Sequence, residues 1–495
     1  MSMKSIRTRI PPSPTGYVHI GTLRTALFNY FFAKQNGGDF IIRIEDTDRE
    51  RLVEGSVENL LSTFEKIGIV HTEGPFLEAD GTMVQKGDHG PYIQSERLDI
   101  YKGYVDKLLA SGDAYYCFDS KEELEKLREE QRATKQRIKY DRRALKLGKD
   151  EVAKKLEAGE SHVIRMKIPE GKTVIEDLIR GTIEFDNQDV GDQIIMKSDG
   201  YPTYHLAVVV DDHLMKVTHI MRGEEWISST PKHVILYKML GFDLPVFAHM
   251  PLLLNPDKSK LSKRQGDVSV EDYLKKGYVK EALINFIGTL GYNPKSDQEI
   301  YSFDELIELF DITKVNKSGA VINHEKLDWM NNHYIRTIEL EDLIERSKAF
   351  TDLDLSDAMM RRAFAVERER MNRLEEINEK LAPYTSTDTP GAEMLTWKKA
   401  DVEDAKQQLS GLSELMNTLE EQVFTQREEI ETAIKNYIEE KGLQNGNVLW
   451  PLRVALSGRE KSPSPFEMLW IYGKDKSIER IENAVSVLNE SLNSI

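Results

Sequence analysis

The spacing of apolar residues near the start of the chain predicts a strand, a helix and a second strand. Residues 5–10 form a short run that is typical of a strand. Within residues 23–35, apolar side chains at positions 23, 26, 27, 30 and 31 follow one helix face. Gly37 and Gly38 can end that helix, and residues 39–44 predict the next strand. The pattern therefore predicts a βαβ unit.

The turn between the first strand and the helix combines prolines, which restrict the backbone, with glycines, which leave room for a ligand beside it. The prolines within residues 11–14 fix their own φ and hold the preceding residues extended. Gly16 and Gly21 let a ligand approach the backbone where the helix begins, and the free N–H groups there suit a phosphate. His19 adds a donor. A turn of this kind can also serve packing alone, and a single histidine is more often structural.

Later parts of the chain give simpler patterns. The apolar run at residues 206–210 predicts a buried parallel strand. Beyond residue 268 the pattern is mostly helical, and from about residue 336 long charged amphipathic stretches are broken at Pro383, Pro390-Gly391, Gly442 and Pro463-Ser-Pro465. We expect an all-helical C-terminal region, which could equally be a dimerisation unit.

Length and composition exclude several classes of protein. The chain has 495 residues, 40% of them hydrophobic and 31% charged, so we expect two or more domains with cores of their own. No apolar run approaches the length of a membrane span, no signal or transit segment is recognisable, and the single Cys117 excludes intrachain disulfides. These features favour a cytoplasmic protein.

The net charge of −17 argues against a nucleic-acid partner only weakly, because local patches set the binding field. Residues 131–149 carry eight Lys and Arg against one Asp. Such a stretch could meet an RNA backbone, although a solvated helix face is the simpler interpretation of this stretch alone.

Two motifs in the expected order make the chemistry specific. Residues 12–21, Pro-Ser-Pro-Thr-Gly-Tyr-Val-His-Ile-Gly, resemble the first signature of class I aminoacyl-tRNA synthetases in its glutamyl and glutaminyl branch, with Thr22 where the general class has a second His. About 240 residues downstream, residues 260–264, Lys-Leu-Ser-Lys-Arg, resemble the Lys-Met-Ser-Lys-Ser loop of that class. Residues 44–48, 90–97 and 197–226 also follow the family pattern. The sequence is similar to the bacterial-type glutamyl-tRNA synthetase family.

The resemblance implies an α/β fold: a Rossmann-like, doubly wound parallel-sheet catalytic domain with an inserted acceptor-binding domain, followed by an all-helical anticodon-binding region. The implied divisions are residues 1–97 for the first catalytic half, 98–196 for the insertion that grips the tRNA acceptor arm, 197–245 for the second catalytic half, 246–335 for the lysine loop and stem contacts, and 336–495 for anticodon binding.

The implied reaction is the ATP-dependent ligation of glutamate to tRNA, with catalysis by positioning and electrostatics. The expected catalytic residues are His19, Lys260, Lys263 and Arg264. Glutamate would contact Arg9, Ser13, Glu45, Tyr204 and Arg222, with Glu45 on the ammonium group and the two arginines on the carboxylates in an order left open. ATP would contact Pro12, Thr15, Gly16, His19, Gly21, Thr22, Glu225, Leu261, Ser262 and Lys263. Arg368 and Arg370 fall near the anticodon-reading position.

Mg²⁺ is expected with ATP, and no structural zinc is expected, because Cys117 has no second cysteine to complete the knuckle that some relatives carry. The expected partners are L-glutamate and tRNA specific for glutamate, with charging of tRNA specific for glutamine left open, no membrane, and a monomeric chain.

Four alternatives remain at this stage. A glutaminyl-tRNA synthetase usually ends in β-barrels, which the helical C-terminal pattern disfavours. A shortened relative that modifies a tRNA base lacks the last 160 or so residues present here. A non-catalytic tRNA-binding paralogue would be expected to have lost His19 or Lys263, and a simple nucleotidyltransferase would not need so long a C-terminal half. One departure concerns substrate recognition, since Val208 stands where the family usually has Asn.

Overall fold

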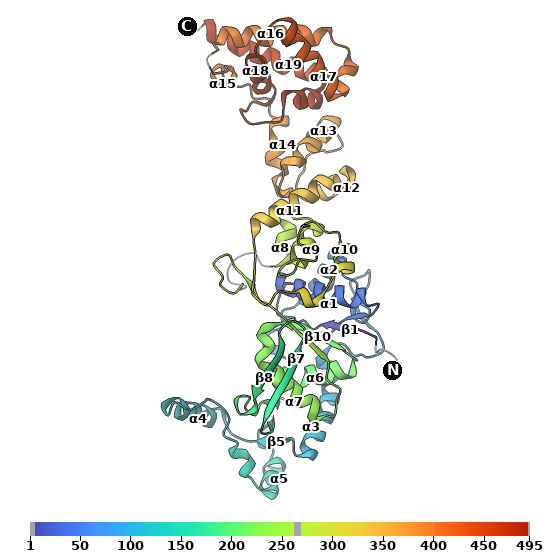
Figure 1. Ribbon diagram of the computed structural model, residues 1–495, viewed down its shortest axis with the longest axis vertical. Helices are drawn as coiled ribbons and strands as arrows, with labels where there is room; N and C mark the ends of the chain where they lie inside the picture. The colour runs from blue at the N-terminus through green and yellow to red at the C-terminus, as the bar shows by residue number, and fades with distance from the viewer. Residues whose placement is uncertain (1–4, 262–268, 399, 494–495) are drawn as a thin grey trace. The chain divides into compact units, whose positions relative to one another are not determined.

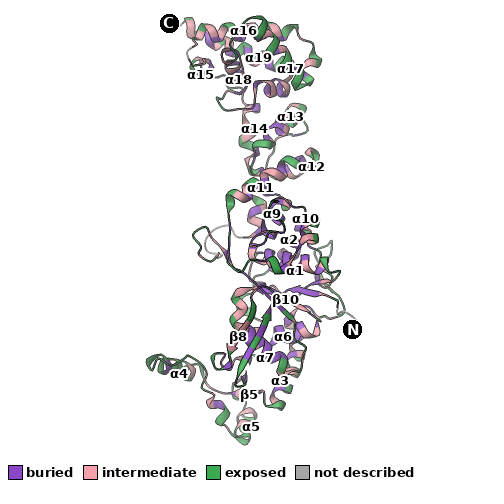
Figure 2. Ribbon diagram, viewed as in Figure 1, coloured by how far each residue is buried: buried purple, intermediate pink, exposed green. Residues whose placement is uncertain are grey.

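The computed structural model describes residues 5–261, 269–398 and 400–493 (Figure 1). The chain divides into two compact units. The first consists of Met1–Leu274 with Lys280–His324, and the second of Lys275–Val279 with Glu325–Ile495. Each unit has its own set of buried residues (Figure 2).

Parallel strands joined by helices form the centre of the first unit. Strand β1 (Arg7–Ile10) pairs in parallel with β2 (Asp39–Ile42), and α1 (Ile20–Gln35) connects them. Strand β10 (His219–Gly223) pairs in parallel with β11 (Val246–Met250), and α7 (Thr230–Met239) connects those. The backbone N–H of Thr218 donates to the carbonyl of Arg7 at 2.9 Å, which places the two pairs next to each other. The predicted α/β class and its first βαβ unit are confirmed.

Helix α1 is buried along most of its length. Leu23, Leu27, Phe28 and Phe31 are all fully buried, and the Phe28 ring lies 5.2 Å from the ring of Phe310. Because α1 is covered by the sheet on one side and by later helices on another, the face predicted from the sequence is only part of its buried surface. The helix gives way to the left-handed backbone of Gly37 at φ 61°, where glycine is favoured.

The prediction of a strand at residues 206–210 is wrong. These residues lie within helix α6 (Tyr204–Leu214), and all five are buried. A short apolar run fits a buried helix as well as a buried strand, because a helix covered on every side shows no amphipathic period. As a result Tyr204 and His205 lie in the first turn of a helix.

Residues 98–196 contribute to the sheet that carries β10. The hairpin of β7 (Lys172–Asp177) and β8 (Gly181–Asp186) joins this sheet where Asp177 pairs with Phe247 of β11. Helix α3 (Leu98–Ser111) packs into the same apolar cluster as α6. A separate antiparallel sheet contains β5 (Ala114–Cys117), β6 (Val163–Met166) and β9 (Ile194–Met196).

The first unit has further described elements. Its other strands are β3 (Gly74–Leu77), β4 (Met83–Lys86), β12 (Leu253–Leu254) and β13 (Ala320–Val321). Its other helices are α2 (Ser56–Ile67), α4 (Lys121–Ala133), α5 (Lys149–Glu157), α9 (Lys280–Gly288) and α10 (Phe303–Leu309). Helix α8 (Val270–Lys275) ends at the division between the units.

The described part of the second unit is helical, as predicted. Helix α11 (His324–Thr337) leads into it, and α19 (Pro465–Asn493), which changes direction at Gly473, packs against α13, α16, α17 and α18. The other helices are α12 (Leu340–Ser347), α13 (Ala358–Glu367), α14 (Ile377–Thr385), α15 (Ala392–Leu395), α16 (Val402–Thr418), α17 (Arg427–Glu440) and α18 (Asn445–Ser457).

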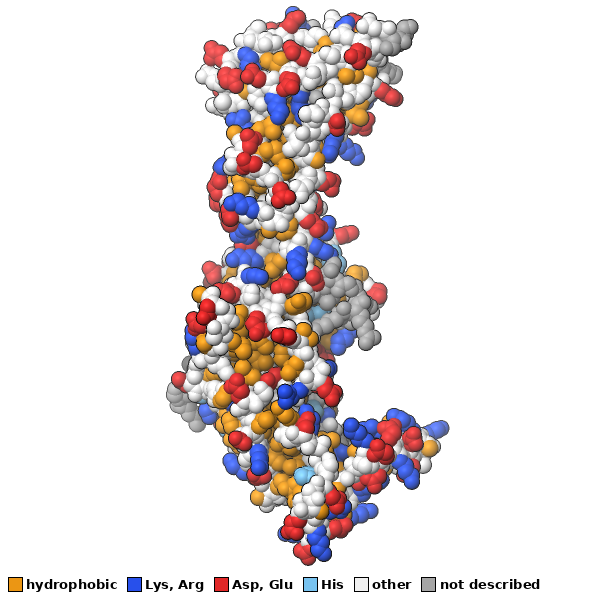
Figure 3. Space-filling view, turned by 180° about the vertical axis from the view of Figure 1, so that it is seen from behind, with side chains coloured by type: hydrophobic (Ala, Val, Ile, Leu, Met, Phe, Trp, Pro, Cys, Tyr) orange, Lys and Arg blue, Asp and Glu red, His pale blue; other side chains and the backbone are white. Residues whose placement is uncertain are grey.

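The surface seen in Figure 3 carries acidic and basic side chains side by side, so the negative net charge does not gather into one acidic face there. Among the helices that the structure describes, none has both the length and the apolar character needed to cross a membrane.

Candidate active site

A cavity of about 930 Å³ in the first unit lies where the parallel strands end and where α1 and α6 begin. Ligands in open α/β sheets bind at this end of the strands. The sequence-predicted residues that line the cavity are Arg9, Pro12, Ser13, Thr15, His19, Gly21, Thr22, Glu45, Tyr204, Arg222, Glu225, Lys260 and Leu261. Gly16 is not among the lining residues. Ser262, Lys263 and Arg264 lie outside the described residues.

His19 caps the N-terminus of α1 with its side chain. Its Nδ1 accepts the backbone N–H of Gly21 at 2.9 Å, so a neutral ring carries its proton on Nε2. A Cβ at position 21 would lie 3.2 Å from that same Nδ1. Glycine therefore keeps the helix start open while the histidine ring is held in one orientation.

Both ends of the segment that carries the second motif lie at this turn. Leu261 lines the cavity, and its backbone N–H donates to the Leu253 carbonyl at 3.1 Å. On the other side, Ser269 forms a β-bridge with His19, and the backbone N–H of Val270 donates to Val18 at 2.8 Å. The chain thus leaves the cavity wall at Leu261 and returns beside His19.

Two of the residues that line the cavity, Arg9 and Glu45, belong to a buried network of charges that compensate one another. Arg9 donates from Nε and Nη2 to the two carboxylate oxygens of Asp212, at 3.1 Å each, and both side chains are fully buried. Arg43 lies 2.7 Å from Asp212 and 2.9 Å from Glu45. It is also 3.7 Å from Asp211. Each of these buried arginines therefore has at least one carboxylate partner.

Glu45 belongs to this network and also faces the cavity. Burial raises the pKa of Glu45 to about 7, even though Arg43 and Arg9 favour its ionised form. A carboxylate that is buried, yet open to a cavity, gains from a cationic ligand that restores the interactions it has lost with water.

Arg222 is held in a different way. Its guanidinium donates to the Tyr204 hydroxyl at 3.2 Å, the Thr230 hydroxyl at 2.9 Å and the imidazoles of His233 and His249 at 3.3 and 3.1 Å. Among the described residues, no carboxylate lies within salt-bridge distance of it. Burial lowers the pKa of Arg222, only partly opposed by Tyr204. Its positive charge is therefore available to an anionic ligand in the cavity.

Sequence reasoning missed Arg24 and the partners of the two cavity arginines. Arg24 lines the cavity, and its Nη2 donates to the Pro251 carbonyl, while Nε and Nη1 have no hydrogen-bond partner among the described residues. Burial lowers its pKa to about 10, although Glu225 and Glu224 oppose the shift. The available signal was an arginine in the first turns of a helix whose neighbouring residues, Leu23 and Ala26, are apolar.

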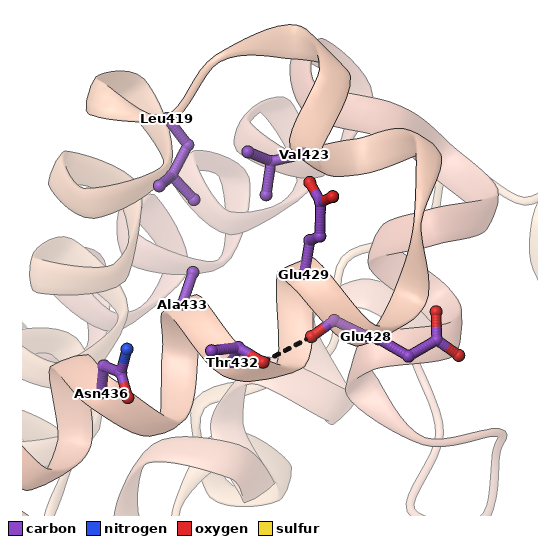
Figure 4. A pocket seen from close by; sticks show the side chains of 7 residues that line it. All are labelled: Leu419, Val423, Glu428, Glu429, Thr432, Ala433 and Asn436. Carbon is purple, nitrogen blue, oxygen red and sulfur yellow. Dashed lines mark hydrogen bonds between the residues drawn. The ribbon is translucent and has the colours of Figure 1, made fainter.

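In the second unit, the two predicted anticodon-reading arginines already bond within the fold. Arg368 donates from Nη1 to the Ile338 carbonyl at 3.0 Å. Arg370 donates to the Val366 carbonyl at 3.2 Å and lies 3.5 Å from Glu467. A separate pocket of about 420 Å³ contains neither of them and is lined by Leu419, Val423, Glu428, Glu429, Thr432, Ala433 and Asn436 (Figure 4).

Comparisons with known proteins agree with this geometry. The family described as tRNA synthetases class I (E and Q), catalytic domain, matches residues 5–329, and the anticodon binding domain family matches residues 338–485. A glutamate–tRNA ligase from Chloroherpeton thalassium is 46% identical over 511 aligned positions, covering 99% of each chain. One from Clostridioides difficile is 43% identical and covers 96% of this chain and 98% of its own.

This chain belongs to the glutamate–tRNA ligase family. A crystal structure of a glutamate tRNA ligase from Elizabethkingia meningosepticum in complex with its amino acid superposes with a TM-score of 0.88 at 35% identity, covering 98% of this chain and all of that chain. The predicted family is confirmed, together with the catalytic and helical anticodon-binding parts of a glutamate–tRNA ligase.

Proposed function

We propose that this protein activates glutamate with ATP and transfers the glutamyl group to the terminal ribose of tRNA. The observation that carries the proposal is a single cavity in which Arg9, Glu45 and Arg222 lie with the His19 turn and with Lys260. Groups that would bind the amino acid and groups that would bind phosphate therefore line the same cavity. The family relationship supports the same reaction.

Glutamate has one ammonium group and two carboxylates, and the cavity offers a group of opposite charge for each. Glu45 would bind the ammonium group, while Arg9 and Arg222 would bind the carboxylates. Arg222 suits this role because its charge has only neutral partners. Glutamine would replace one carboxylate with a neutral amide and leave a buried guanidinium without its counter-charge, so the site would reject it.

ATP would bind across the start of α1 as MgATP, with Mg²⁺ held by phosphate oxygens and water. The positive end of the helix suits its phosphates, and Thr22 in the first turn lines the cavity there. Glu225, Leu261 and Ser262 would contact the rest of the nucleotide. Lys263 lies two residues beyond Leu261, which lines the cavity.

The chemistry requires positioning more than a reactive side chain. The α-carboxylate of glutamate attacks the α-phosphate of ATP, and pyrophosphate leaves. A ribose hydroxyl of tRNA then attacks the carbonyl of the glutamyl adenylate, and AMP leaves. His19, Lys260, Lys263 and Arg264 would stabilise negative charge that grows on the phosphates in the first step.

Replacing Lys263 with Ala tests the catalytic assignment. We expect kcat for tRNA charging to fall by about 10²-fold or more while the KM for glutamate changes little. Pyrophosphate release measured with glutamate, ATP and tRNA present would report the first step directly. Lys258→Ala, a change at an exposed residue of the preceding turn, is the matched control. Pyrophosphate release by Lys263→Ala at the parental rate would contradict the assignment.

For the tRNA, we assign acceptor-arm binding to residues 98–196, stem contacts to residues 246–335 and anticodon reading to residues 336–495, with Arg368 and Arg370 as candidate readers. We expect a monomer acting in the cytoplasm. Charging of separate transcripts of tRNA specific for glutamate and for glutamine, each with both amino acids, tests the specificity. Glutamylation of both transcripts would identify a non-discriminating ligase.

A further inference from the structure

A row of hydrogen bonds extends from Arg222 away from the cavity to a buried carboxylate. Arg222 donates from Nε to Nε2 of His249 at 3.1 Å, and Nδ1 of His249 lies 2.6 Å from Oδ2 of Asp177. His249 is fully buried and Asp177 is 5% exposed. Neither residue is among those that line the cavity, so both act on a ligand only through Arg222.

The geometry requires one tautomer of His249. Oδ2 of Asp177 is an acceptor, so the imidazole proton belongs on Nδ1, which leaves the lone pair of Nε2 for the Nε–H of Arg222. The Thr230 hydroxyl lies 3.1 Å from the same Nε2. The opposite tautomer would place an N–H of His249 against an N–H of Arg222, and their repulsion would move the guanidinium.

The other hydrogen-bonding partners of Arg222 are also uncharged groups. His233 accepts from Nη1 through Nδ1, and its Nε2 lies 3.0 Å from Nδ1 of His205. Burial lowers the pKa of His233, His249 and His205, in the last case to about 4, and the positive charge of Arg222 lowers each further, while Asp177 only partly opposes the shift of His249. Lys232 also faces this group and acts in the same direction on His205 and His233. The three histidines are therefore neutral acceptors and donors at neutral pH.

We propose that Asp177 and His249 are positioning residues for glutamate, with Asp177 fixing the His249 tautomer that holds the Arg222 guanidinium in place. This proposal rests on the proposed function of Arg222 as a carboxylate-binding group. It also gives a role in amino-acid recognition to β7, which belongs to the segment that the sequence assigned to acceptor-arm binding.

Asp177→Asn tests the tautomer directly. The backbone N–H groups of Ile179 and Arg180 donate to Oδ1 of Asp177 at 3.0 and 2.8 Å, and that of His249 donates to Oδ1 at 3.3 Å and to Oδ2 at 3.0 Å. The amide oxygen of Asn keeps all three donors only in the place of Oδ1, so its NH₂ faces His249. His249 would then accept on Nδ1 and carry its proton toward Arg222. We expect the KM for glutamate in tRNA charging to rise by about tenfold or more, with the KM for ATP within about twofold.

A double-mutant cycle with His249→Ala separates the tautomer from general loosening of the fold. Ala removes both ring nitrogens, so we expect the KM for glutamate to rise by about tenfold from this change alone, and no imidazole proton remains for residue 177 to place. In that background Asp177→Asn should add less than about twofold. A purely structural role predicts the same factor in both backgrounds, which would overturn the proposal.

Asp192→Asn is the matched control, because Asp192 is also buried and bonded to backbone and side chains within residues 98–196 but does not contact Arg222. It should lower the melting temperature without changing the ratio of the two KM values. An unchanged KM for glutamate in Asp177→Asn would also overturn the proposal. A parental enzyme that fails to charge tRNA with glutamate would refute the proposed function instead, so the two failures are distinguishable.

Discussion

Two buried arginines line the same cavity, yet their surroundings are opposite. Arg9 is paired with Asp212, which it shares with Arg43, in a network that also contains Glu45 and Asp211. Arg222 is surrounded by hydroxyl groups and neutral imidazoles. The charges around Arg9 already compensate one another. Among the residues that the structure describes, the charge of Arg222 has no counter-ion until an anionic ligand binds.

The difference indicates which region mainly stabilises the folded protein and which region mainly binds the ligand. A buried ion pair is strongly destabilising to break, because one uncompensated charge remains in the interior. An uncompensated buried guanidinium is destabilising while the site is empty and is relieved only when an anion binds. Mutations in the Arg9 region should therefore affect stability first, and mutations in the Arg222 region should affect glutamate use first.

The largest effect on stability is expected for Asp212→Asn. Removing this carboxylate leaves Arg9 without an acidic partner and takes one from Arg43, and all three side chains are fully buried. We expect a loss of about 3–5 kcal/mol in the free energy of unfolding, measured by urea denaturation. Asp39→Asn is the control: the Asp39 side chain is 38% exposed and its partner Arg7 keeps Glu73 as a second acidic partner, so the change should alter stability by less than about 1 kcal/mol. Equal losses in the two variants would contradict the comparison.

Arg222→Gln should show the reverse pattern. We expect kcat/KM for glutamate to fall by about 10²-fold to 10³-fold, because a charged contact to the substrate is lost. The free energy of unfolding should stay the same or rise, since the change removes a buried charge and leaves no carboxylate unpaired. Chemical denaturation and steady-state charging of tRNA would measure both quantities. A loss of stability as large as that of Asp212→Asn would show that Arg222 is a structural residue.

Glu45 connects the two regions, and its titration gives a pH test. Burial raises its pKa in the folded protein to about 7 from an ordinary value of 4.5. Folding is therefore favoured by the bound proton below pH 4.5, and this contribution is lost as pH rises from 4.5 to about 7. Ammonium binding needs the ionised form, so kcat/KM for glutamate should rise about tenfold per pH unit up to about 7 and then level off. Glu45→Gln should lower kcat/KM and remove this rise; a profile that keeps it would assign the titration to another group.

Much of the fold was predictable because the spacing of apolar residues and the glycines that end helices are local properties of a sequence. The spacing over residues 23–35 and the glycines after it were enough to place α1, and the charged amphipathic stretches were enough to predict the helical second unit. Helix α6 was not predictable in this way, since Leu206–Val210 is apolar on every side. Its environment, rather than its own pattern, decides between helix and strand.

In the candidate site too, some residues could be predicted from the sequence and others could not. Side chains within motifs, such as His19 and Glu45, could be found from the sequence, and the structure brings them to one cavity. Their partners could not, because Arg9 and Asp212 are 203 positions apart and Asp177 and His249 are 72 apart. Only the fold brings these pairs together, and neither carboxylate stands in a motif that marks its partner.

The smallest expected effect is that of Tyr204→Phe, which removes one neutral acceptor from Arg222. The Tyr204 hydroxyl accepts from Nη1 at 3.2 Å, and burial raises the pKa of Tyr204, so it remains a phenol. We expect kcat/KM for glutamate to fall by about threefold to tenfold with little change in stability, because one hydrogen bond to a guanidinium that keeps three others is lost. Tyr101→Phe is the matched change on the compensated side, where the hydroxyl donates to Asp211 at 2.8 Å. It should lower the melting temperature and leave the KM for glutamate unchanged, and the opposite result for the pair would mean that the compensated network, rather than the Arg222 cluster, controls glutamate binding.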